Sequence, residues 1–361
     1  MSMSIQCTEL KQIEKSYNEI KMGKGSYNDL KNRISQYEKY FPISTKYYYA
    51  LFYHECAKEA EKADQIITNA LSELEKSKLT PIEIFLGNSL LIDVYGLAGE
   101  IYAHNNKPEL SLRLYQNYQL YLSRIKSTDI RDDLLTFRNY NEYTLSDLIN
   151  NEITLCSPRV MNDPYDTLLL KWGEYFANDT NHPRKHIGPL LQSMESYRIR
   201  SFCKLRNKEN DNMIGNILMW SHYAGQHRGF CIQYHFSDQF TNATTEKRTT
   251  RLKEIIYRNN KDALDITRST IDTNIGLCTK HIDWQYENEV RLISYELGSS
   301  DLFCPVPLDD ASYIKCIYFG YKCDDKNIRT IKKILANKPE IEYYKMKSDY
   351  KDIFRLTPQK I

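Results

Sequence analysis

The chain has 361 residues, of which 41% are hydrophobic and 27% charged, the proportions of a soluble globular protein. This length predicts two domains, because it exceeds what one small hydrophobic core organises. The formal net charge of +2 excludes the uniformly basic surface typical of many nucleic-acid-binding proteins. No apolar run approaches the roughly 18 residues that cross a bilayer, so we expect no membrane association. An odd number of cysteines (nine), without a C-x-x-C pair or a secretory signal, predicts reduced thiols in the cytoplasm.

Residues 1–126 have the apolar spacing of α-helices. The first two helices are separated at Gly23 and Gly25, and Pro42 is expected to end the second. Thr80 and Pro81 are typical of a helix start, and the sequence between Asn105 and Pro108 separates the last two helices. A third segment places its apolar residues on one stripe: Cys56, Ala60, Ala63, Ile67, Ala70 and Leu74. We therefore predict an all-α domain over residues 1–126.

The last helical hairpin of this domain resembles a tetratricopeptide repeat. The resemblance rests on small and aromatic residues near the spacing of that repeat: Tyr95, Ala98, Gly99, Tyr102, Ser111, Tyr115 and Tyr118. It implies stacked antiparallel helix pairs whose concave surface binds a protein partner or acts as a sensor. The alternative is that these helices only support the second domain.

Residues 127–361 change to short strands mixed with helices, which predicts an α+β domain. Polar residues 126–133 are expected to link the two domains, and the basic tract Arg248–Lys253 to lie on a solvated face. The expected strands are Leu134–Tyr140, Glu152–Ser157, Ile199–Phe202, Phe230–Phe236, Ile255–Tyr257, Val290–Tyr295 and Ile314–Phe319. The expected helices are Tyr143–Asn150, Tyr165–Phe176, Pro189–Arg198, Ile214–Tyr223, Ala263–Cys278 and Ile328–Leu335.

The stretch Ser201–Phe236 is the densest mixture of aromatic, imidazole and charged side chains in the chain. Its polar and aromatic residues cluster at Trp220, Ser221, His222, Tyr223, His227 and Arg228. Core packing seldom needs such a mixture, so we expect part of a ligand pocket here. The alternative for His222 is a hydrogen-bonded histidine of the core. No cysteine or carboxylate falls at zinc-ligand spacing near His222 and His227, so we expect no metal site.

Three motifs resemble a bacterial family known as domain of unknown function 2971. They are M-W-S-H-Y-A-x-x-H-x-G-F-C-I at Met219–Ile232, N-D-P-Y-D at Asn162–Asp166 and W-Q-Y-E-N-E-V-R-L-I at Trp284–Ile293. The resemblance extends from about Leu134 to the C-terminus and implies no particular activity. Asn-Asp-Pro is turn chemistry that caps a helix, although a helix N-terminus also favours anions. Asn162 and Asp166 are thus either capping residues or part of the same pocket.

Glu287 and Glu289 precede an apolar strand, and their i, i+2 spacing places both carboxylates on one face. The pair is similar to the E-x-E strand of ADP-ribosyltransferases. That resemblance implies that Glu289 hydrogen-bonds the nicotinamide ribose of NAD and stabilises the oxocarbenium-like transition state, while Glu287 orients the acceptor. The alternative is that both glutamates only pair with Lys280, Arg291 or solvent.

The order of the preceding elements is similar to the same superfamily. Arg138 on the first strand would grip NAD with Ser157 or Ser201, and Tyr140, Trp220 or Tyr223 would stack on a ring of the dinucleotide. Ser201-Phe202-Cys203 would correspond to a Ser-x-Ser motif, from which Cys203 departs.

The expected function is an NAD-consuming effector, either an ADP-ribosyltransferase or an NAD glycohydrolase. NAD is its substrate, no metal is required, and fusion to helical repeats resembles a bacterial toxin or anti-phage defence protein. The alternative is a non-catalytic regulatory module that binds a protein or a nucleotide. The two differ in geometry, because catalysis requires Arg138, Glu289 and the Trp220–Tyr223 group to meet in one pocket. The sequence predicts no oligomeric state.

Overall fold

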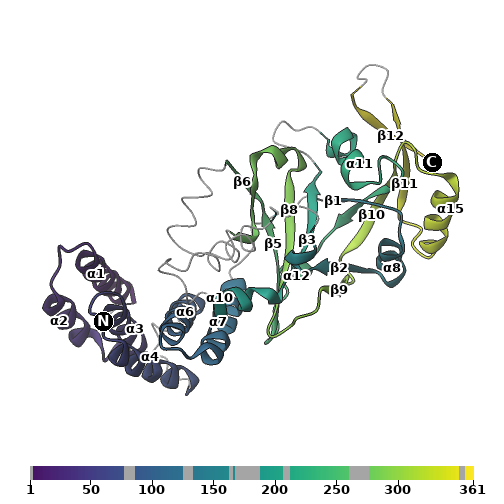
Figure 1. Cartoon of the computed structure of the whole chain (residues 1–361). Coiled ribbons are helices and arrows are strands. Elements are labelled where there is room, and N and C mark those ends of the chain that lie inside the picture. Colours follow the sequence, from purple (N-terminus) through teal and green to yellow (C-terminus); the bar gives the residue numbers. More distant parts are fainter. Residues whose placement is uncertain are drawn as a thin grey trace. The chain divides into compact units, whose positions relative to one another are not determined.

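The computed structural model describes residues 3–76, 86–124, 133–161, 166, 188–205, 212–259, 276–348 and 354–361 (Figure 1). The chain forms two compact units. The first comprises Met1–Ile125 and Gly173–Glu195, and the second Lys126–Trp172 and Ser196–Ile361. None of the described helices combines the length and the apolar character needed to cross a membrane.

The described part of the first unit is helical, as predicted for the N-terminal region. Its helices are α1 (Met3–Lys21), α2 (Tyr27–Tyr37), α3 (Pro42–Glu55), α4 (Ala60–Glu75), α6 (Asn88–His104), α7 (Pro108–Ser123) and α10 (Gly188–Ser193). One expectation is corrected, because α2 already ends at Tyr37 and Pro42 begins α3. Proline fits the first helical turn, where its fixed φ is helical and its missing N–H needs no partner.

Apolar stripes hold these helices together. Ala63, Ile67 and Ala70 of the predicted stripe are buried against α3 and α6. In the α6–α7 hairpin, the hydroxyl of Ser111 donates to the carbonyl of Gly99 at 2.7 Å. The ring of Tyr115 lies directly over Gly99, so that the two helices pack closely.

The second unit is built on a mixed sheet with ten strands in its described part. They are β1 (Leu134–Arg138), β2 (Glu152–Cys156), β3 (Tyr197–Lys204), β4 (Phe230–His235), β5 (Arg248–Glu254), β8 (Glu289–Glu296), β9 (Phe303–Pro307), β10 (Tyr313–Phe319), β11 (Glu342–Ser348) and β12 (Leu356–Lys360). The spatial order is β12-β11-β10-β4-β1-β3-β2-β9, while β8 pairs with β3 and β5. β6 (Ile256–Arg258) and β7 (Thr279–His281) form a separate parallel pair.

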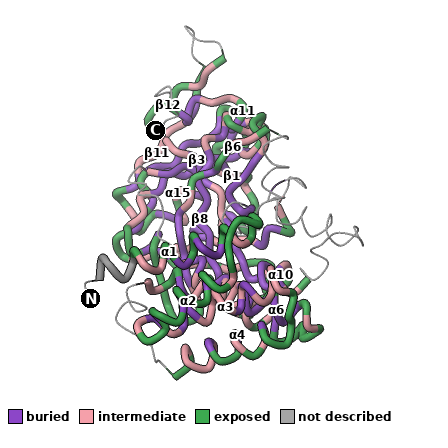
Figure 2. The backbone as a smooth tube through the Cα atoms, turned by 90° about the vertical axis from the view of Figure 1, so that its left-hand side faces the viewer, coloured by how far each residue is buried: buried purple, intermediate pink, exposed green. Residues whose placement is uncertain are grey.

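Short helices cover this sheet, and the mixed α+β architecture agrees with the prediction. They are α8 (Glu142–Asn150), α11 (Ile217–Tyr223), α12 (Asp238–Thr241) and α15 (Asp325–Ile334), with 3₁₀ turns η1 (Pro158–Val160), η2 (Met194–Ser196), η3 (Met213–Gly215) and η4 (Ile282–Glu287). One apolar cluster includes Phe202, Phe230 and Leu292, and a second includes Phe137 and Trp220. The central strands are accordingly among the most buried parts of the chain (Figure 2).

Several local predictions are corrected. Arg248–Lys253 belongs to β5, and Arg251 within it is buried, donating to the carbonyls of Ala243 and Thr250. The helix predicted over Pro189–Arg198 is α10 followed by η2, and β3 already begins at Tyr197. Strands β9, β11 and β12 were not predicted. The helices expected at Tyr165–Phe176 and Ala263–Cys278 lie, apart from Asp166 and residues 276–278, outside the described residues.

The edge of β3 opposite β8 is shared by two strands. β8 pairs with β3 along its length, from Tyr197 to Cys203, and therefore occupies one edge completely. On the other edge, β1 pairs at Cys203 and Lys204, whereas β2 pairs at Ile199. The sheet thus splits between β1 and β2 beside residues 200–202, and this split creates the space for the site described below.

Gly229 fixes the end of β1, and its replacement tests how tightly this part of the sheet is built. A Cβ atom at Gly229 would lie 2.1 Å from the carbonyl oxygen of Arg138. We therefore expect Gly229→Ala to lower the free energy of unfolding by roughly 3 kcal/mol, through forced separation of β1 and β4. Urea unfolding followed by tryptophan fluorescence measures this. Gly188→Ala is the control, because a Cβ there meets no atom within 4 Å; equal losses in the two variants would contradict the packing described.

Candidate functional site

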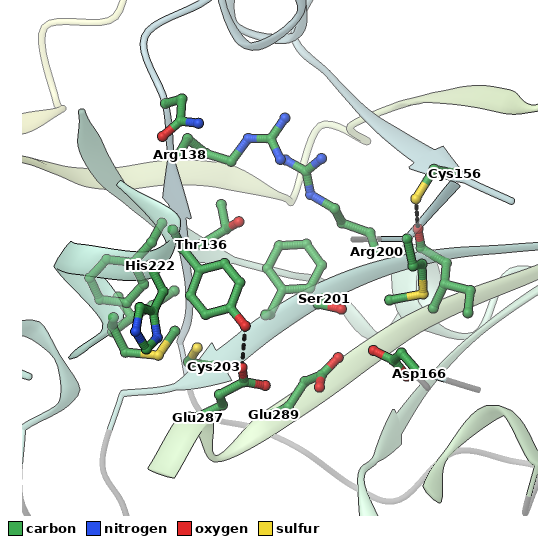
Figure 3. A pocket seen from close by; sticks show the side chains of 18 of the residues that line it. Thr136, Arg138, Cys156, Asp166, Arg200, Ser201, Cys203, His222, Glu287 and Glu289 are labelled. Carbon is green, nitrogen blue, oxygen red and sulfur yellow. Dashed lines mark hydrogen bonds between the residues drawn. The ribbon is translucent and has the colours of Figure 1, made fainter. Parts of the chain in front are cut away.

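A cavity of about 370 Å³ occupies the split in the sheet (Figure 3). Its volume lies in the range of small-molecule pockets. β1, β3, α11, η4 and β8 all contribute to its walls. The structure brings these predicted site residues together around it: Arg138, Asp166, Ser201, His222, Tyr223, Glu287 and Glu289.

Glu287 and Glu289 lie together on one side of the cavity. Glu287 ends η4 and Glu289 begins β8, with Asn288 between them in the left-handed region at φ 46°. Both carboxylates accept hydrogen bonds from Nζ of Lys280, at 2.5 Å and 3.1 Å. The hydroxyl of Tyr223 also donates to Glu287.

The buried side chain of Arg291 fixes the positions of two carboxylates on this acidic side of the cavity. Its side chain is wholly buried, and its Nε donates to Oε1 of Glu289 at 2.7 Å. Nη2 reaches both carboxylate oxygens of Asp166 at 2.7 Å, and Nη1 donates to the carbonyl of Leu277 at 2.7 Å. Three carboxylates therefore face two cations, and a formal charge of −1 remains at this side of the cavity.

The two glutamates have opposite electrostatic environments. Burial raises the pKa of Glu289, but Arg291 and Lys280 outweigh burial and bring that pKa to about 2. Burial, together with the negative charge of Glu289, raises the pKa of Glu287 above its ordinary value despite Lys280. Of the two carboxylates, Glu289 is therefore the more readily ionised, and Glu287 holds its proton more tightly.

Arg138 and Arg200 form the opposite, cationic side, where their guanidinium groups lie next to each other (Figure 3). Burial and then the charge of Arg200 lower the pKa of Arg138 to about 9. Among the described residues, Nε of each arginine is buried without a hydrogen-bond partner. Within the described part of the chain, Arg200 is anchored by a 3.3 Å bond to the carbonyl of Thr154 and by Asp147 at 3.8 Å. Two neighbouring guanidinium groups that line the cavity and have buried N–H donors without a partner suit the binding of an anionic group.

Other predicted site residues lie elsewhere. Trp220 is fully buried, and its indole N–H donates to the carbonyl of Ile214 at 2.7 Å, so it is a core residue and not a ring platform. Ser157 caps η1 through the N–H of Arg159. Tyr140 packs against the apolar cluster around Phe202. Neither of these two lines the cavity, and Asn162 lies outside the described residues.

The histidines also differ from expectation. His222 is exposed at the rim of the cavity, where its Nδ1 lies 3.0 Å from the hydroxyl of Tyr286. It is therefore not a core histidine. His227 instead pairs through Nε2 with the hydroxyl of Ser221 at 3.0 Å, outside the cavity lining.

The role of Arg200 was not predicted from the sequence. Arg200 lies next to Ser201 on a predicted strand, but it reaches the cavity because β1 and β2 share one edge of β3 and leave a split between them. The alternative that Lys280 and Arg291 pair with the two glutamates is confirmed by their contacts. Pairing does not remove the glutamates from the cavity, which both still line.

One family model matches part of this unit. Residues 219–292 match the family described as "Protein of unknown function (DUF2971)". The matched segment contains Tyr223, Glu287 and Glu289 but neither Arg138 nor Arg200, and it is shorter than the region of the expected resemblance. No curated protein and no solved structure matches the chain.

Because the pKa of Glu289 is lowered and that of Glu287 is raised, we expect removal of the charge to cost more stability at Glu289 than at Glu287. Glu289→Gln removes the ionised acceptor of Nε of the wholly buried Arg291 and of Nζ of Lys280, so we expect a loss of about 3 kcal/mol in unfolding free energy. Glu287→Gln removes a charge that the folded state tolerates poorly and should change stability by less than about 1 kcal/mol. Chemical denaturation at neutral pH measures both. Glu254→Gln, which breaks an exposed pair with Lys204, is the control; equal losses at Glu287 and Glu289 would contradict this assignment.

The same shifts predict a pH dependence of stability. The low pKa of Glu289 stabilises the folded state above the ordinary glutamate pKa of 4.5, and this contribution is lost as the pH falls towards 2. The raised pKa of Glu287 acts in the other direction, since its contribution is present below pH 4.5 and is lost as the pH rises through the folded-state pKa. Melting temperatures between about pH 5 and pH 2 should fall less steeply for Glu289→Gln than for the wild type or Glu287→Gln. Parallel curves would count against the ion-pair network.

Proposed function

We propose that the second unit consumes NAD, as an ADP-ribosyltransferase or an NAD glycohydrolase. The observation that carries the proposal is a single cavity with a pair of arginines on one side and a pair of glutamates on the other. Such a cavity suits a ligand that is anionic at one end and becomes cationic at the other. NAD, with its diphosphate and its positively charged nicotinamide ring, has this distribution of charge.

Arg138 and Arg200 would bind the diphosphate. The planar guanidinium group matches phosphate oxygens with two parallel hydrogen bonds. A bound phosphate would satisfy the buried Nε atoms and would screen the repulsion between the two cations. The energetic cost of keeping two arginines together would then be offset only in the liganded state.

The carboxylates would act on the bond between nicotinamide and ribose. As the C–N bond breaks, nicotinamide leaves as a neutral molecule and positive charge develops on the ribose. The ionised Glu289 would stabilise this charge. Glu287 would accept the proton of the attacking water or acceptor hydroxyl as its oxygen bonds to the ribose carbon. The hydroxyl of Tyr223 would orient Glu287 for this transfer.

The helical unit would recruit a protein partner or sense a signal. Support comes from the α6–α7 hairpin, in which Gly99 and Tyr115 form the close small-to-aromatic contact expected from a tetratricopeptide-like hairpin. A role as a toxin or an anti-phage defence protein follows from the same combination of domains by analogy.

A nucleotide-binding regulatory module is the second candidate. One observation favours it: Oε1 and Oε2 of Glu289 are both engaged, by Arg291 and Lys280. A ribose hydroxyl would have to compete with these ion pairs. In this case the cavity would bind the nucleotide without cleaving it.

Release of nicotinamide from NAD by the purified full-length protein, with and without a cell lysate that supplies acceptors, tests catalysis. We expect Glu287→Gln to lower the turnover number by about 100-fold or more, because the proton acceptor is lost. Glu342→Gln, which removes a surface ion pair with Lys360 in the same unit, should leave turnover unchanged. No turnover by the wild type under either condition would rule out the enzymatic proposal.

Calorimetric titration with ADP-ribose separates binding from catalysis. Arg138→Gln should weaken binding by about tenfold or more, because a charge-assisted hydrogen bond is lost. The exposed Arg228→Gln is the matched control. Binding that depends on Arg138 without any turnover would favour the regulatory module. Absence of binding would reject both candidates for this cavity.

A further inference from the structure

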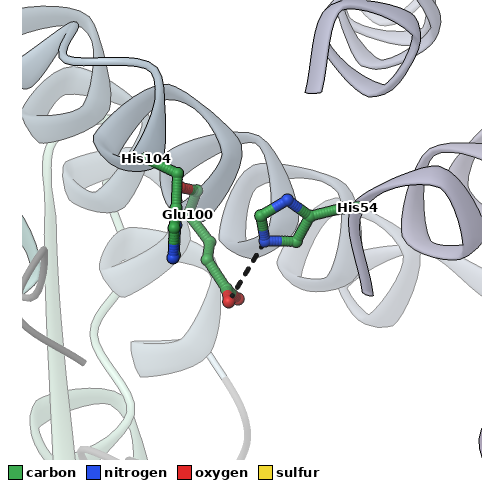
Figure 4. Close-up of side chains that lie close together, drawn as sticks. All are labelled: His54, Glu100 and His104. Carbon is green, nitrogen blue, oxygen red and sulfur yellow. Dashed lines mark hydrogen bonds and ion pairs between the residues drawn. The ribbon is translucent and has the colours of Figure 1, made fainter. Parts of the chain in front are cut away.

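Two histidines and a glutamate converge in the first unit. His54 lies in the last turn of α3, while Glu100 and His104 are one turn apart on α6. Residues at i and i+4 share a helix face, and the packing of α3 near α6 brings His54 to that face. The potential ligand atoms all lie within 4.8 Å of one another, and the three side chains point toward a common point (Figure 4).

The spacing is close to that of a tetrahedral metal site. Nε2 of His54 lies 3.4 Å from Oε1 of Glu100. Two ligands at about 2.0–2.1 Å from zinc in a tetrahedron are about 3.4 Å apart. The rings of His54 and His104 have their centroids 5.0 Å apart at 76°. Small side-chain rotations at His104 would therefore complete three coordination positions.

The second nitrogen of His104 has a partner of the kind found in metal sites. Its Nδ1 lies 3.0 Å from the carbonyl oxygen of Glu100. Nδ1 must donate in this bond, which leaves Nε2 with the lone pair that binds a metal. Metal-bound histidines usually donate their other N–H to a carbonyl or carboxylate in this way. The His54 side chain is only 12% exposed, so its ring is held by the surrounding helices.

We propose that His54, Glu100 and His104 bind a divalent first-row transition ion, for which Zn²⁺ is the probe. Two imidazoles and one carboxylate suit Zn²⁺, whereas Mg²⁺ and Ca²⁺ prefer oxygen ligands. Three protein ligands leave a fourth position for water or for a ligand atom of another molecule. The ion would tie the end of α3 to α6. This site was not predicted from the sequence, because His54 is distant in sequence from Glu100 and His104.

Zinc titration of the chelator-treated full-length protein tests the site. We expect His104→Ala and Glu100→Gln each to weaken zinc binding at this site by about tenfold or more, and to abolish most of the zinc-induced rise in melting temperature. His235→Ala is the control, because His235 is partly exposed and pairs with the single carboxylate of Asp133. Equal zinc binding by wild type and variants would overturn the proposal.

Cobalt substitution gives a readout that does not depend on variants. Co²⁺ bound by nitrogen and oxygen should show visible d–d absorption without a thiolate charge-transfer band. A thiolate band would place the ion at one of the free cysteines and would overturn the proposal.

Without metal, the His104→Ala and Glu100→Gln variants should melt within a few degrees of the wild type, because the side chains of His104 and Glu100 are exposed.

Discussion

The buried guanidinium of Arg291 is the constraint on which the second unit depends. A charge without solvent contact must be paired, and removal of one partner costs about 3–5 kcal/mol. Two of its partners come from other segments, since Asp166 precedes β3 and the carbonyl of Leu277 precedes β7, while Glu289 lies two residues away on β8. Satisfying this one cation therefore ties three parts of the chain together and fixes the carboxylates that form the acidic side of the cavity.

The cationic side has a different origin. β1 and β2 share one edge of β3, and the split between them leaves room for the side chains of Arg138 and Arg200. Among the described residues, the carboxylate near this pair is Asp147, 3.8 Å from Arg200, whereas Arg291 has close hydrogen bonds to two carboxylates. This weaker compensation separates the proposed ligand site from the structural ion pairs of Arg291.

Local patterns predicted much of the fold, because helical stripes and alternating strands depend on neighbouring residues. Glu287 and Glu289 lie together as predicted, but not as neighbours on one strand face, because Glu287 ends η4 and only Glu289 belongs to β8. What failed depended on distant partners. Trp220 was predicted to line the pocket, but its indole N–H donates to the carbonyl of Ile214 in the core. The tract Arg248–Lys253 was predicted to be solvated because its pairing with β8 and the bond from Arg251 to the carbonyl of Ala243 depend on residues outside the tract. The approach of Arg200 to Arg138 and of His54 to Glu100 required the tertiary fold.

The most direct test of the central proposal is the crystal structure of the Glu287→Gln protein with NAD, in which slow turnover should preserve the ligand. We expect the diphosphate between the guanidinium groups of Arg138 and Arg200, with the nicotinamide ribose beside Glu289. NAD bound elsewhere, or a diphosphate on the carboxylate side, would contradict it. A cavity that stays empty at saturating NAD would equally contradict the proposal that the arginine pair binds the diphosphate.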